Sequence, residues 1–352
     1  MLEEKRKILT RTIPFLLAGL ILLLLYFYFF VGFSNIIDAF SKVNPGIFLL
    51  AVLACIIETL FFTFTWYYLL RTLSISISFP RALSYVLTGI FVDILIPAES
   101  VSAEVSKVYL MNQEGADVGK VTATLITQRI YGMIITAVSM LSACLILFIT
   151  DYPLPSLILN LVLVVAGLTL VFLVLILIFC LRKEITERLV RGILRILRRI
   201  IPKRFDLRSW ERMAESGLNT FFPSLAVLAK KPESLLISIF SAISSWIFHL
   251  LVSQFVFYSL GYQISFSIVV IVYSVSMIVQ SIPAGIPAEV GVTEIVMSSL
   301  YGMFGVPLAL SAAATILIRF LNVWLKFILG FIALQWVGVK IIVEKQKQIK
   351  QD

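Results

Sequence analysis

Two arginines lie within apolar segments of the sequence, and each follows a glutamate by 25 positions: Arg129 after Glu104, and Arg319 after Glu294. An ionised side chain inside an apolar span is costly and is usually paired or functional. A guanidinium group can bind two oxygens of a phosphate or a carboxylate at once. Each arginine is therefore interpreted either as a ligand for an anionic headgroup or as the partner of a buried glutamate.

An internal match relates these two sites. Residues 96–99, Ile-Pro-Ala-Glu, recur as residues 286–289, and a shift of 190 positions without a gap also superposes Gly115 on Gly305. Ten of the 34 positions from 96 to 129 are identical in this register. Apolar composition alone would not match a proline, two glutamates and an arginine, so the pattern indicates a duplicated functional unit.

The predicted headgroup site collects the polar residues around the two copies. Asn322 and Lys326 continue from Arg319 at steps of three and four, which places one polar stripe along a helix. The predicted substrate-binding set is Arg129, Arg319, Glu99, Glu104, Lys107, Glu289, Glu294, Asn322 and Lys326. Helix breaks are expected at Pro97, Pro283, Pro287 and Gly291, and the candidate buried partners are Glu58, Asp93 and His249.

The role of the four glutamates at the breaks stays open among several hypotheses. A carboxylate in the first turn of a helix is stabilised by the helix dipole, which is a purely structural role. The same carboxylates could pair with the arginines, touch the substrate or carry protons. A restarted helix also directs free N–H groups at the site, which would favour an anion if the carboxylates point elsewhere.

The sequence lacks the motifs of a catalyst. It contains no phosphate-binding glycine loop and no nucleophile elbow. His249 is the single histidine and has no Cys or Asp at ligand spacing, so no metal site is expected. We therefore expect a protein that is not an enzyme, with no cofactor and no nucleic-acid partner.

The composition places these residues in a membrane. Of the 352 residues, 60% are apolar and 14% are charged, and the mean hydropathy is +1.02. The apolar runs are long enough to cross a bilayer as helices, whereas a β-barrel would show short alternating segments. The sequence predicts an all-α, multi-pass protein of the cytoplasmic membrane with a single membrane domain over residues 1–352.

Six full spans are expected, over residues 13–33, 46–70, 118–149, 154–181, 234–260 and 308–339. Two shorter pieces broken by proline, 82–113 and 265–304, have helices too short to cross comfortably. Residues 182–231 hold 13 Lys/Arg against 5 Asp/Glu, so this segment is expected to be cytoplasmic. When the spans are counted in both directions from this segment, both termini lie in the cytoplasm. Each broken piece then enters the membrane and leaves it on the same face.

The two broken pieces then enter the membrane from opposite faces as re-entrant hairpins. This is an inverted-topology duplication, with repeat one at about 46–150 and repeat two at about 234–339. Non-helical backbone at that depth is tolerated only inside protein or beside a wet cavity. A cavity between the two breaks is therefore expected.

The basic segment begins with an expected amphipathic helix at 182–201. It carries two stripes at helical spacing, one apolar and one basic: Ile185, Leu189, Ile193, Ile196 and Ile200, and Arg188, Arg191, Arg195 and Arg198. Such a helix is expected to lie on an anionic leaflet as a surface anchor and topology determinant. Specific recognition of a lipid headgroup is the alternative.

The residues of both copies resemble a known family. Pro-Ala-Glu-Val-Gly-Val-Thr-Glu at 287–294, followed by Gly305-Val306-Pro307 and by Arg319, Trp324 and Gly330, looks like the signature of the lysylphosphatidylglycerol synthase transmembrane-region (flippase-like domain) family. Ala-Glu-Val-Ser-Lys-Val-Tyr-Leu at 103–110 is similar to that family's Gly-Glu-x-x-Arg-x-Tyr-Leu. Ala288 and Glu289 stand where the family usually has paired glycines, and Lys107 stands where arginine is usual.

The resemblance implies the lipid-handling membrane half of this family without a transferase domain. We expect a flippase or scramblase-like translocator of an anionic lipid, a phospholipid or a polyprenyl-phosphate-linked sugar, whose phosphate is held by Arg129 and Arg319. One alternative is a proton- or ion-coupled transporter of a small solute. Another is a non-transporting partner that presents lipid to a separate transferase.

Overall fold

The computed structural model describes Leu25 and residues 33–96, 101–152, 155–200, 207–280 and 286–349. Most of these residues are helical and none of them forms a strand, as the sequence predicts. Five helices are long and apolar enough to cross a membrane: Pro45–Thr72, Val118–Ile149, Ser156–Leu181, Pro232–Ser259 and Leu308–Gly338. They correspond to five of the six expected spans, and the sixth, 13–33, lies almost wholly outside the described residues.

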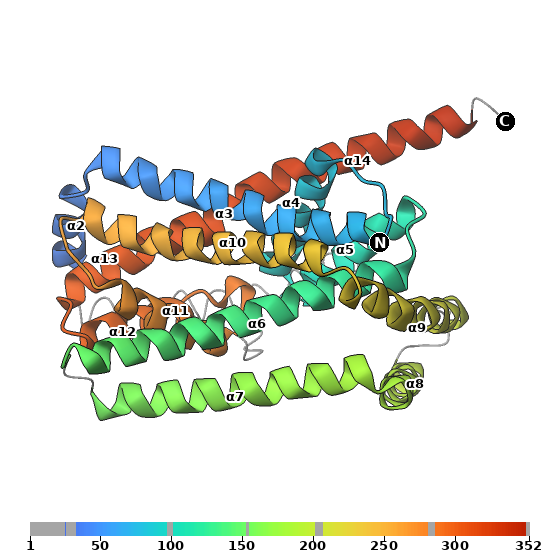
Figure 1. Cartoon of the computed structure of the whole chain (residues 1–352). Helices are drawn as coiled ribbons and strands as arrows, with labels where there is room; N and C mark the ends of the chain where they lie inside the picture. The colour runs from blue at the N-terminus through green and yellow to red at the C-terminus, as the bar shows by residue number, and fades with distance from the viewer. Residues whose placement is uncertain are drawn as a thin grey trace.

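Helices α3 (Pro45–Thr72) and α10 (Pro232–Ser259) lie side by side as an antiparallel pair (Figure 1). The Asn44 backbone N–H donates to the Ser259 carbonyl at 2.7 Å at one end, and Lys231 Nζ donates to the Thr72 carbonyl at 3.0 Å at the other. Between these ends, the Ser241 and Ser245 hydroxyls of α10 donate to the Phe61 and Glu58 carbonyls of α3, at 3.0 and 3.2 Å. This pair is the scaffold against which the shorter helices are placed.

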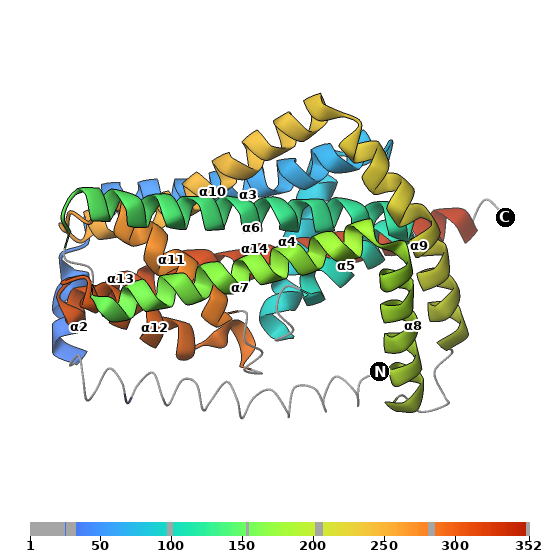
Figure 2. The ribbon, with the colours of Figure 1, turned by 60° about the horizontal axis from the view of Figure 1, so that its bottom comes forward.

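Helices α6 (Val118–Ile149) and α7 (Ser156–Leu181) run side by side along one face of the bundle (Figures 1 and 2). The Asp117 side chain caps α6 by accepting a hydrogen bond from the Lys120 N–H at 3.0 Å. α7 is apolar all round, and large side chains such as Leu163 and Leu170 are exposed on it. An apolar outer surface of this kind suits a helix that contacts lipid.

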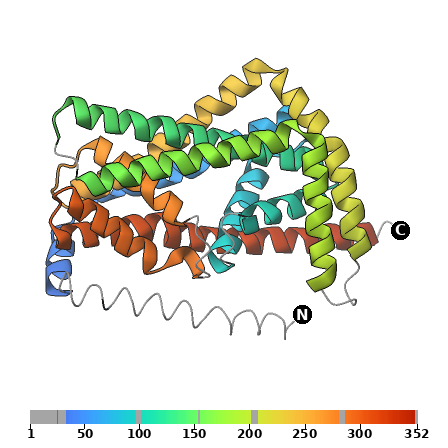
Figure 3. The same ribbon diagram turned by 90° about the horizontal axis from the view of Figure 1, so that it is seen from below.

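Two helical hairpins fill the space between the long helices, and they start at opposite ends of the bundle. The first is α4 (Phe79–Leu95) and α5 (Val101–Gln113), which follows the C-terminal end of α3 and leads into α6. The second is α11 (Phe266–Gln280), the 3₁₀ turn η2 (Pro287–Glu289) and α12 (Val292–Met303), which follows the C-terminal end of α10. Because α3 and α10 are antiparallel, the two hairpins begin at opposite ends, as Figures 1 and 3 show.

The last expected span is divided in the structure. α13 (Leu308–Arg319) passes through a π-helical segment, η3 (Phe320–Leu325), into α14 (Lys326–Ile349). π-helical turns are rare and often mark functional sites. α14 packs closely on α4 because Gly330 has no side chain: a Cβ there would meet the Leu87 carbonyl at 2.5 Å.

The basic segment 182–231 contains more helix than the sequence analysis expected. α8 (Lys183–Ile200) matches the amphipathic helix, but a second helix, α9 (Leu207–Ala229), follows it. α9 packs on the start of α6, where Gly119 lies against the Gly217 backbone and Thr220 Oγ1 donates to Asp117 Oδ1 at 2.5 Å. α8 turns away from the line of α7 and lies beside α9 (Figure 2). A short helix, α2 (Phe33–Ser41), also occupies a stretch expected to be loop.

Candidate functional site

The second break is held by a buried ion pair between Arg319 and Glu294. Arg319 Nε lies 2.8 Å from Glu294 Oε1, and both side chains are less than a tenth exposed, at 8% and 7%. The Nη2 group of Arg319 also donates to the Ala288 carbonyl. Glu294 Oε2 accepts the Gly291 N–H at 2.7 Å, at the start of α12. One carboxylate therefore caps the restarted helix and neutralises the arginine.

The backbone at this break is held in unusual conformations. Ala288 and Glu289 have φ values of 53° and 47°, and Gly291 has a φ of 92°. Left-handed conformations cost roughly 1–2 kcal/mol for residues with a Cβ, so the surroundings must enforce them. The Arg319 hydrogen bond to the Ala288 carbonyl is one contact that does so.

The first copy forms the same pair in a looser way. Arg129 Nη1 lies 3.6 Å from Glu104 Oε1, and these side chains are 43% and 32% exposed. The two ion pairs are equivalent under the shift of 190 positions, so the internal match of the sequence corresponds to a shared contact in space. They differ in state: the pair of the second copy is tight and buried, and the pair of the first copy is open.

Lys107 lies one turn after Glu104 on α5, and it is buried against two aromatic rings of α3. Its ammonium group is 5.4 Å from the centre of the Trp66 ring and 5.7 Å from that of Phe62. A cation over an aromatic face is stabilised by about 0.5–2 kcal/mol, depending on desolvation. The Trp66 ring is held in turn by α6, since Trp66 Nε1 donates to Thr124 Oγ1 at 3.1 Å.

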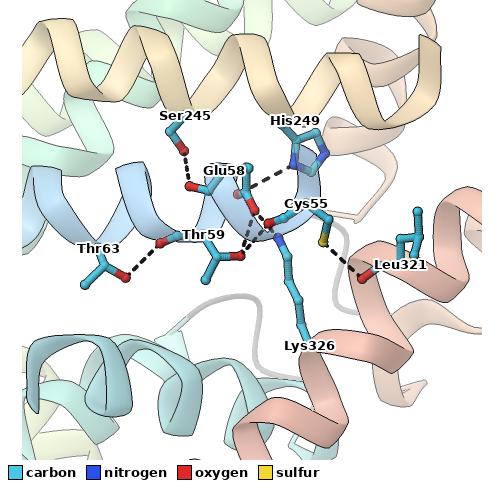
Figure 4. Close-up of polar contacts among 8 residues, drawn as sticks. All are labelled: Cys55, Glu58, Thr59, Thr63, Ser245, His249, Leu321 and Lys326. Carbon is cyan, nitrogen blue, oxygen red and sulfur yellow. Dashed lines mark hydrogen bonds and ion pairs between the residues drawn. The ribbon is translucent and has the colours of Figure 1, made fainter. Parts of the chain in front are cut away.

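A third cluster surrounds Glu58 at the middle of α3 (Figure 4). Lys326 Nζ, at the start of α14, lies 2.5 Å from Glu58 Oε2, and both residues are buried. His249 Nδ1, on α10, lies 3.7 Å from Glu58 Oε1. Thr59 Oγ1 lies within hydrogen-bond distance of the same carboxylate at 3.0 Å. We call these four residues the Glu58 cluster.

The Glu58 cluster and the Lys107 site share one face of α3. Glu58, Phe62 and Trp66 are spaced four residues apart, so they lie one above the other at about 6 Å per step. Lys326 from the second repeat and Lys107 from the first therefore contact neighbouring turns of the same helix face. Both lysines belong to the set predicted from the sequence, but their positions in the chain do not indicate that α3 brings them together.

The tips of the two hairpins also meet. Ile94, near the end of α4, packs against Ala288 and Val290 of the second break and against Val323 of η3. This contact places the tip of the first hairpin against the break of the second. The Ala288 carbonyl in that break accepts the hydrogen bond from Arg319. The two copies thus form one connected region.

The remaining predicted residues divide into those that lie near this region and those that cannot be placed. Asp93 accepts a hydrogen bond from Ser102 and so joins α4 to α5. Asn322 lies on η3 between Arg319 and Lys326, and its buried Oδ1 finds no donor within the described residues. Pro287 begins η2, and Glu289 ends it. Pro97, Glu99 and Pro283 lie outside the described residues.

Several contributors to the site were missed by the sequence analysis. The Cys55 thiol donates to the Leu321 carbonyl of η3 at 3.4 Å, and the Tyr273 ring of α11 lies 4.6 Å from the His249 ring. Thr59 and the rings of Phe62 and Trp66 were also not predicted. Cys55 precedes Glu58 by three residues, and Phe62 and Trp66 follow it at steps of four, which is the signal that could have indicated a shared face.

Taken together, the helices and the contacts at their breaks define a multi-pass helical membrane protein with two buried ion pairs, one within the second repeated segment and one between α3 and α14. The sequence matches the family described as Lysylphosphatidylglycerol synthase TM region over residues 16–330, and the chain belongs to this family. The expected family is thereby confirmed.

Three archaeal relatives are similar over most of their length. A UPF0104 membrane protein of Pyrococcus horikoshii is 29% identical over 320 residues, covering 88% of this chain and 92% of the relative. UPF0104 membrane proteins of Methanothermobacter thermautotrophicus and Methanocaldococcus jannaschii are 25% and 24% identical, over 88% and 94% of this chain and 90% and 96% of the relatives. The chain therefore corresponds to nearly the full length of each.

Proposed function

We propose that this protein translocates an anionic lipid between the leaflets of the cytoplasmic membrane, as a flippase or scramblase-like carrier. The observation that carries the proposal is the connected region at the two breaks, where basic residues of both repeats lie within spans or hairpins of a membrane protein. Ionisable residues placed this way usually mark a substrate path. A lipid phosphate is the anion that a membrane offers, and guanidinium and ammonium groups are its usual ligands.

In this proposal the two arginines act in turn. Arg129 is the accessible ligand in the present conformation, because its pair with Glu104 is long and partly exposed. Arg319 is occupied by Glu294 and by the Ala288 carbonyl. Transport would exchange these states, so that the phosphate is passed from the Arg129 side to the Arg319 side. The two lysines along the α3 face would provide positive charge between them.

The proposed membrane placement follows from charge. We propose that α4–α5 and α11–α12 are oppositely oriented re-entrant hairpins of an inverted repeat, with both termini in the cytoplasm. The opposite starting ends of the hairpins support this arrangement. α8 would lie on the anionic inner leaflet with exposed residues such as Ile193 and Ile196 in the interface and its arginines toward headgroups.

Phospholipids and polyprenyl-phosphate-linked sugars both present a phosphate at the end of an apolar chain, so both fit the proposed substrate class. A transport assay in proteoliposomes with fluorescently tailed phosphatidylglycerol, and the same label on phosphatidylcholine, tests the proposal. We expect the protein to move the anionic lipid between leaflets faster than it moves in protein-free vesicles. The variants Arg129→Gln and Arg319→Gln should lose this acceleration.

Arg71→Gln is a matched control, because Arg71 lies at the exposed end of α3 and its guanidinium contacts only Tyr67 among the described residues. If no lipid moves with wild-type protein, the translocator is refuted, and the lipid-presenting partner and the solute transporter remain. If a soluble solute moves and lipid does not, the chain is a solute transporter.

A further inference from the structure

The ionised Glu58 carboxylate opposes the binding of an anion in the Glu58 cluster. Lys326 is buried and is neutralised by Glu58 at 2.5 Å. A lipid phosphate that approached Lys326 would place a second negative charge beside the Glu58 carboxylate. Buried net charge is strongly unfavourable in a low-dielectric interior, so this step is opposed as long as Glu58 stays ionised.

We propose that Glu58 is a proton-binding site that couples lipid translocation to proton movement. The inference rests on the proposed function, and it identifies the proton as the ion whose gradient drives lipid translocation. When Glu58 takes up one proton, Lys326 loses its partner and can bind one phosphate charge in its place. The cluster has no net charge in either state: Glu58⁻ with Lys326⁺ before, and neutral Glu58 with Lys326⁺ and the anion afterwards. Proton and lipid anion therefore bind together and move in the same direction.

His249 is placed to deliver the proton. Its Nδ1 lies 3.7 Å from Glu58 Oε1, which is longer than a hydrogen bond and can shorten when the ring is protonated. The His249 side chain is 21% exposed, whereas that of Glu58 is 10% exposed, so the imidazole is the more accessible of the two. In the transfer, a proton from water binds the imidazole, and the Nδ1 proton then passes to the carboxylate.

The cluster joins the scaffold helices to the parts of the second repeat that must move. His249 belongs to α10, and its ring lies at a tilt against that of Tyr273 of α11, the first arm of the second hairpin. Glu58 belongs to α3 and holds Lys326, which begins α14 directly after η3. The titratable groups that face Glu58 are His249, Lys326, Cys55 on its own helix, and Tyr273 beyond the histidine.

The link to the arginine site runs through the same helix. Arg319 precedes Lys326 by seven residues, and η3 lies between them. The Cys55 thiol holds the η3 carbonyl of Leu321, so α3 contacts this segment both at Leu321 and at Lys326. Release of Lys326 by a proton would remove the charged contact and leave the weaker thiol contact. A proton on Glu58 therefore loosens the helix that carries Arg319.

The test uses the full chain in vesicles of phosphatidylcholine with a minority of phosphatidylglycerol. Labelled phosphatidylglycerol is followed by dithionite quenching while a pH gradient is imposed, and a trapped pH dye reports proton movement. One proton per lipid anion predicts up to about a tenfold change in the leaflet ratio for each pH unit of gradient. The wild type should show this response and move protons only when the lipid moves.

Glu58→Gln should abolish the response to the gradient and the lipid-dependent proton movement, because the amide cannot take up a proton. Glu58→Gln leaves Lys326 buried and unpaired, so the double variant Glu58→Gln/Lys326→Met provides a neutral cluster that should fold and also show no gradient response. Glu233→Gln, at the exposed first turn of α10, is the control that should behave as wild type.

The outcomes separate the two proposals. If lipid movement by the wild type does not depend on the pH gradient, the coupling to protons is refuted but the proposed translocation is not. A gradient response that survives in Glu58→Gln also refutes the assignment of Glu58. If no lipid moves under any condition, both the translocator and its coupling are overturned.

Labelling of the single histidine offers a readout independent of transport. In protein with ¹⁵N-labelled histidine, the ring signals come from His249 alone, and they should respond to Glu58→Gln. Signals that are identical in the two proteins across the pH range would contradict a proton path from His249 to Glu58.

Discussion

Replacing the glutamate of each Glu–Arg pair in turn, Glu294→Gln and Glu104→Gln, compares two equivalent positions of one chain. The Glu294 carboxylate makes two contacts, to Arg319 Nε at 2.8 Å and to the Gly291 N–H at 2.7 Å, and is buried. Removing one partner of a buried ion pair costs about 3–5 kcal/mol, because the other charge is left without compensation. The Glu104 pair is 3.6 Å long and partly exposed, so its loss should cost about 0–1 kcal/mol.

Thermal unfolding in detergent, followed by tryptophan fluorescence and by recovery on size-exclusion chromatography, measures the difference. On the scale that holds for domains of 150–250 residues, a loss of about 3 kcal/mol lowers Tm by roughly 6–12 °C. We therefore expect a clear decrease in Glu294→Gln and a small one in Glu104→Gln. A double-mutant cycle with Arg319→Gln should give a coupling free energy of about 2–3 kcal/mol, and one with Arg129→Gln less than about 0.5 kcal/mol.

Equal Tm changes for the two substitutions would refute the reasoning, since it derives the difference from burial and distance alone. A negligible coupling between Glu294 and Arg319 would show that the second break is held by other contacts. The comparison needs no transport assay, so it tests the structure of the site apart from its function.

Three further changes test the packing and the charge of the site. Gly119→Ala should detach α9 from α6 and lower Tm by several degrees, because a Cβ there overlaps the Gly217 carbonyl, whereas Gly132→Ala on the same helix meets no atom within 4 Å and should have little effect. Gly330→Ala should separate α14 from α4 at a cost of roughly 1–3 kcal/mol, with Gly338→Ala as its control in unfolding experiments. Lys107→Met should keep the packing against Trp66 and Phe62 but remove the charge, so the rate of phosphatidylglycerol movement should fall about tenfold while Tm changes little. An unchanged rate in Lys107→Met would exclude this lysine from the lipid path.

The sequence predicts the long helices and the second helix break of this molecule well, because each depends on residues close together in the chain. Apolar runs give the long helices, and prolines such as Pro287 give the second break. The internal match also indicates which glutamate belongs to which arginine, since the same 25-residue spacing is repeated. The match cannot show that one pair is buried and the other open, because burial depends on helices from elsewhere in the chain.

Contacts between distant segments were beyond the sequence. Glu58 and Lys326 are separated by 268 positions, and only the packing of α14 near α3 brings them together. α9 was overlooked because its sequence, with Gly217 and Pro223 inside the helix, favours a loop, and its packing on Gly119 overrides that preference. The π-helical turn at η3 has no sequence signature, although it places Asn322 and Lys326 beside the site.

Transfer of labelled phosphatidylglycerol between leaflets in proteoliposomes, compared among wild type, Arg129→Gln, Arg319→Gln and the control Arg71→Gln, tests the central claim most directly. A charged hydrogen bond to phosphate contributes about 1.5–3 kcal/mol, so each site variant should be slower by roughly tenfold or more, and the control should match wild type. Equal rates in all four proteins, or no transfer above that of protein-free vesicles, would contradict a lipid path that uses the two repeated arginines.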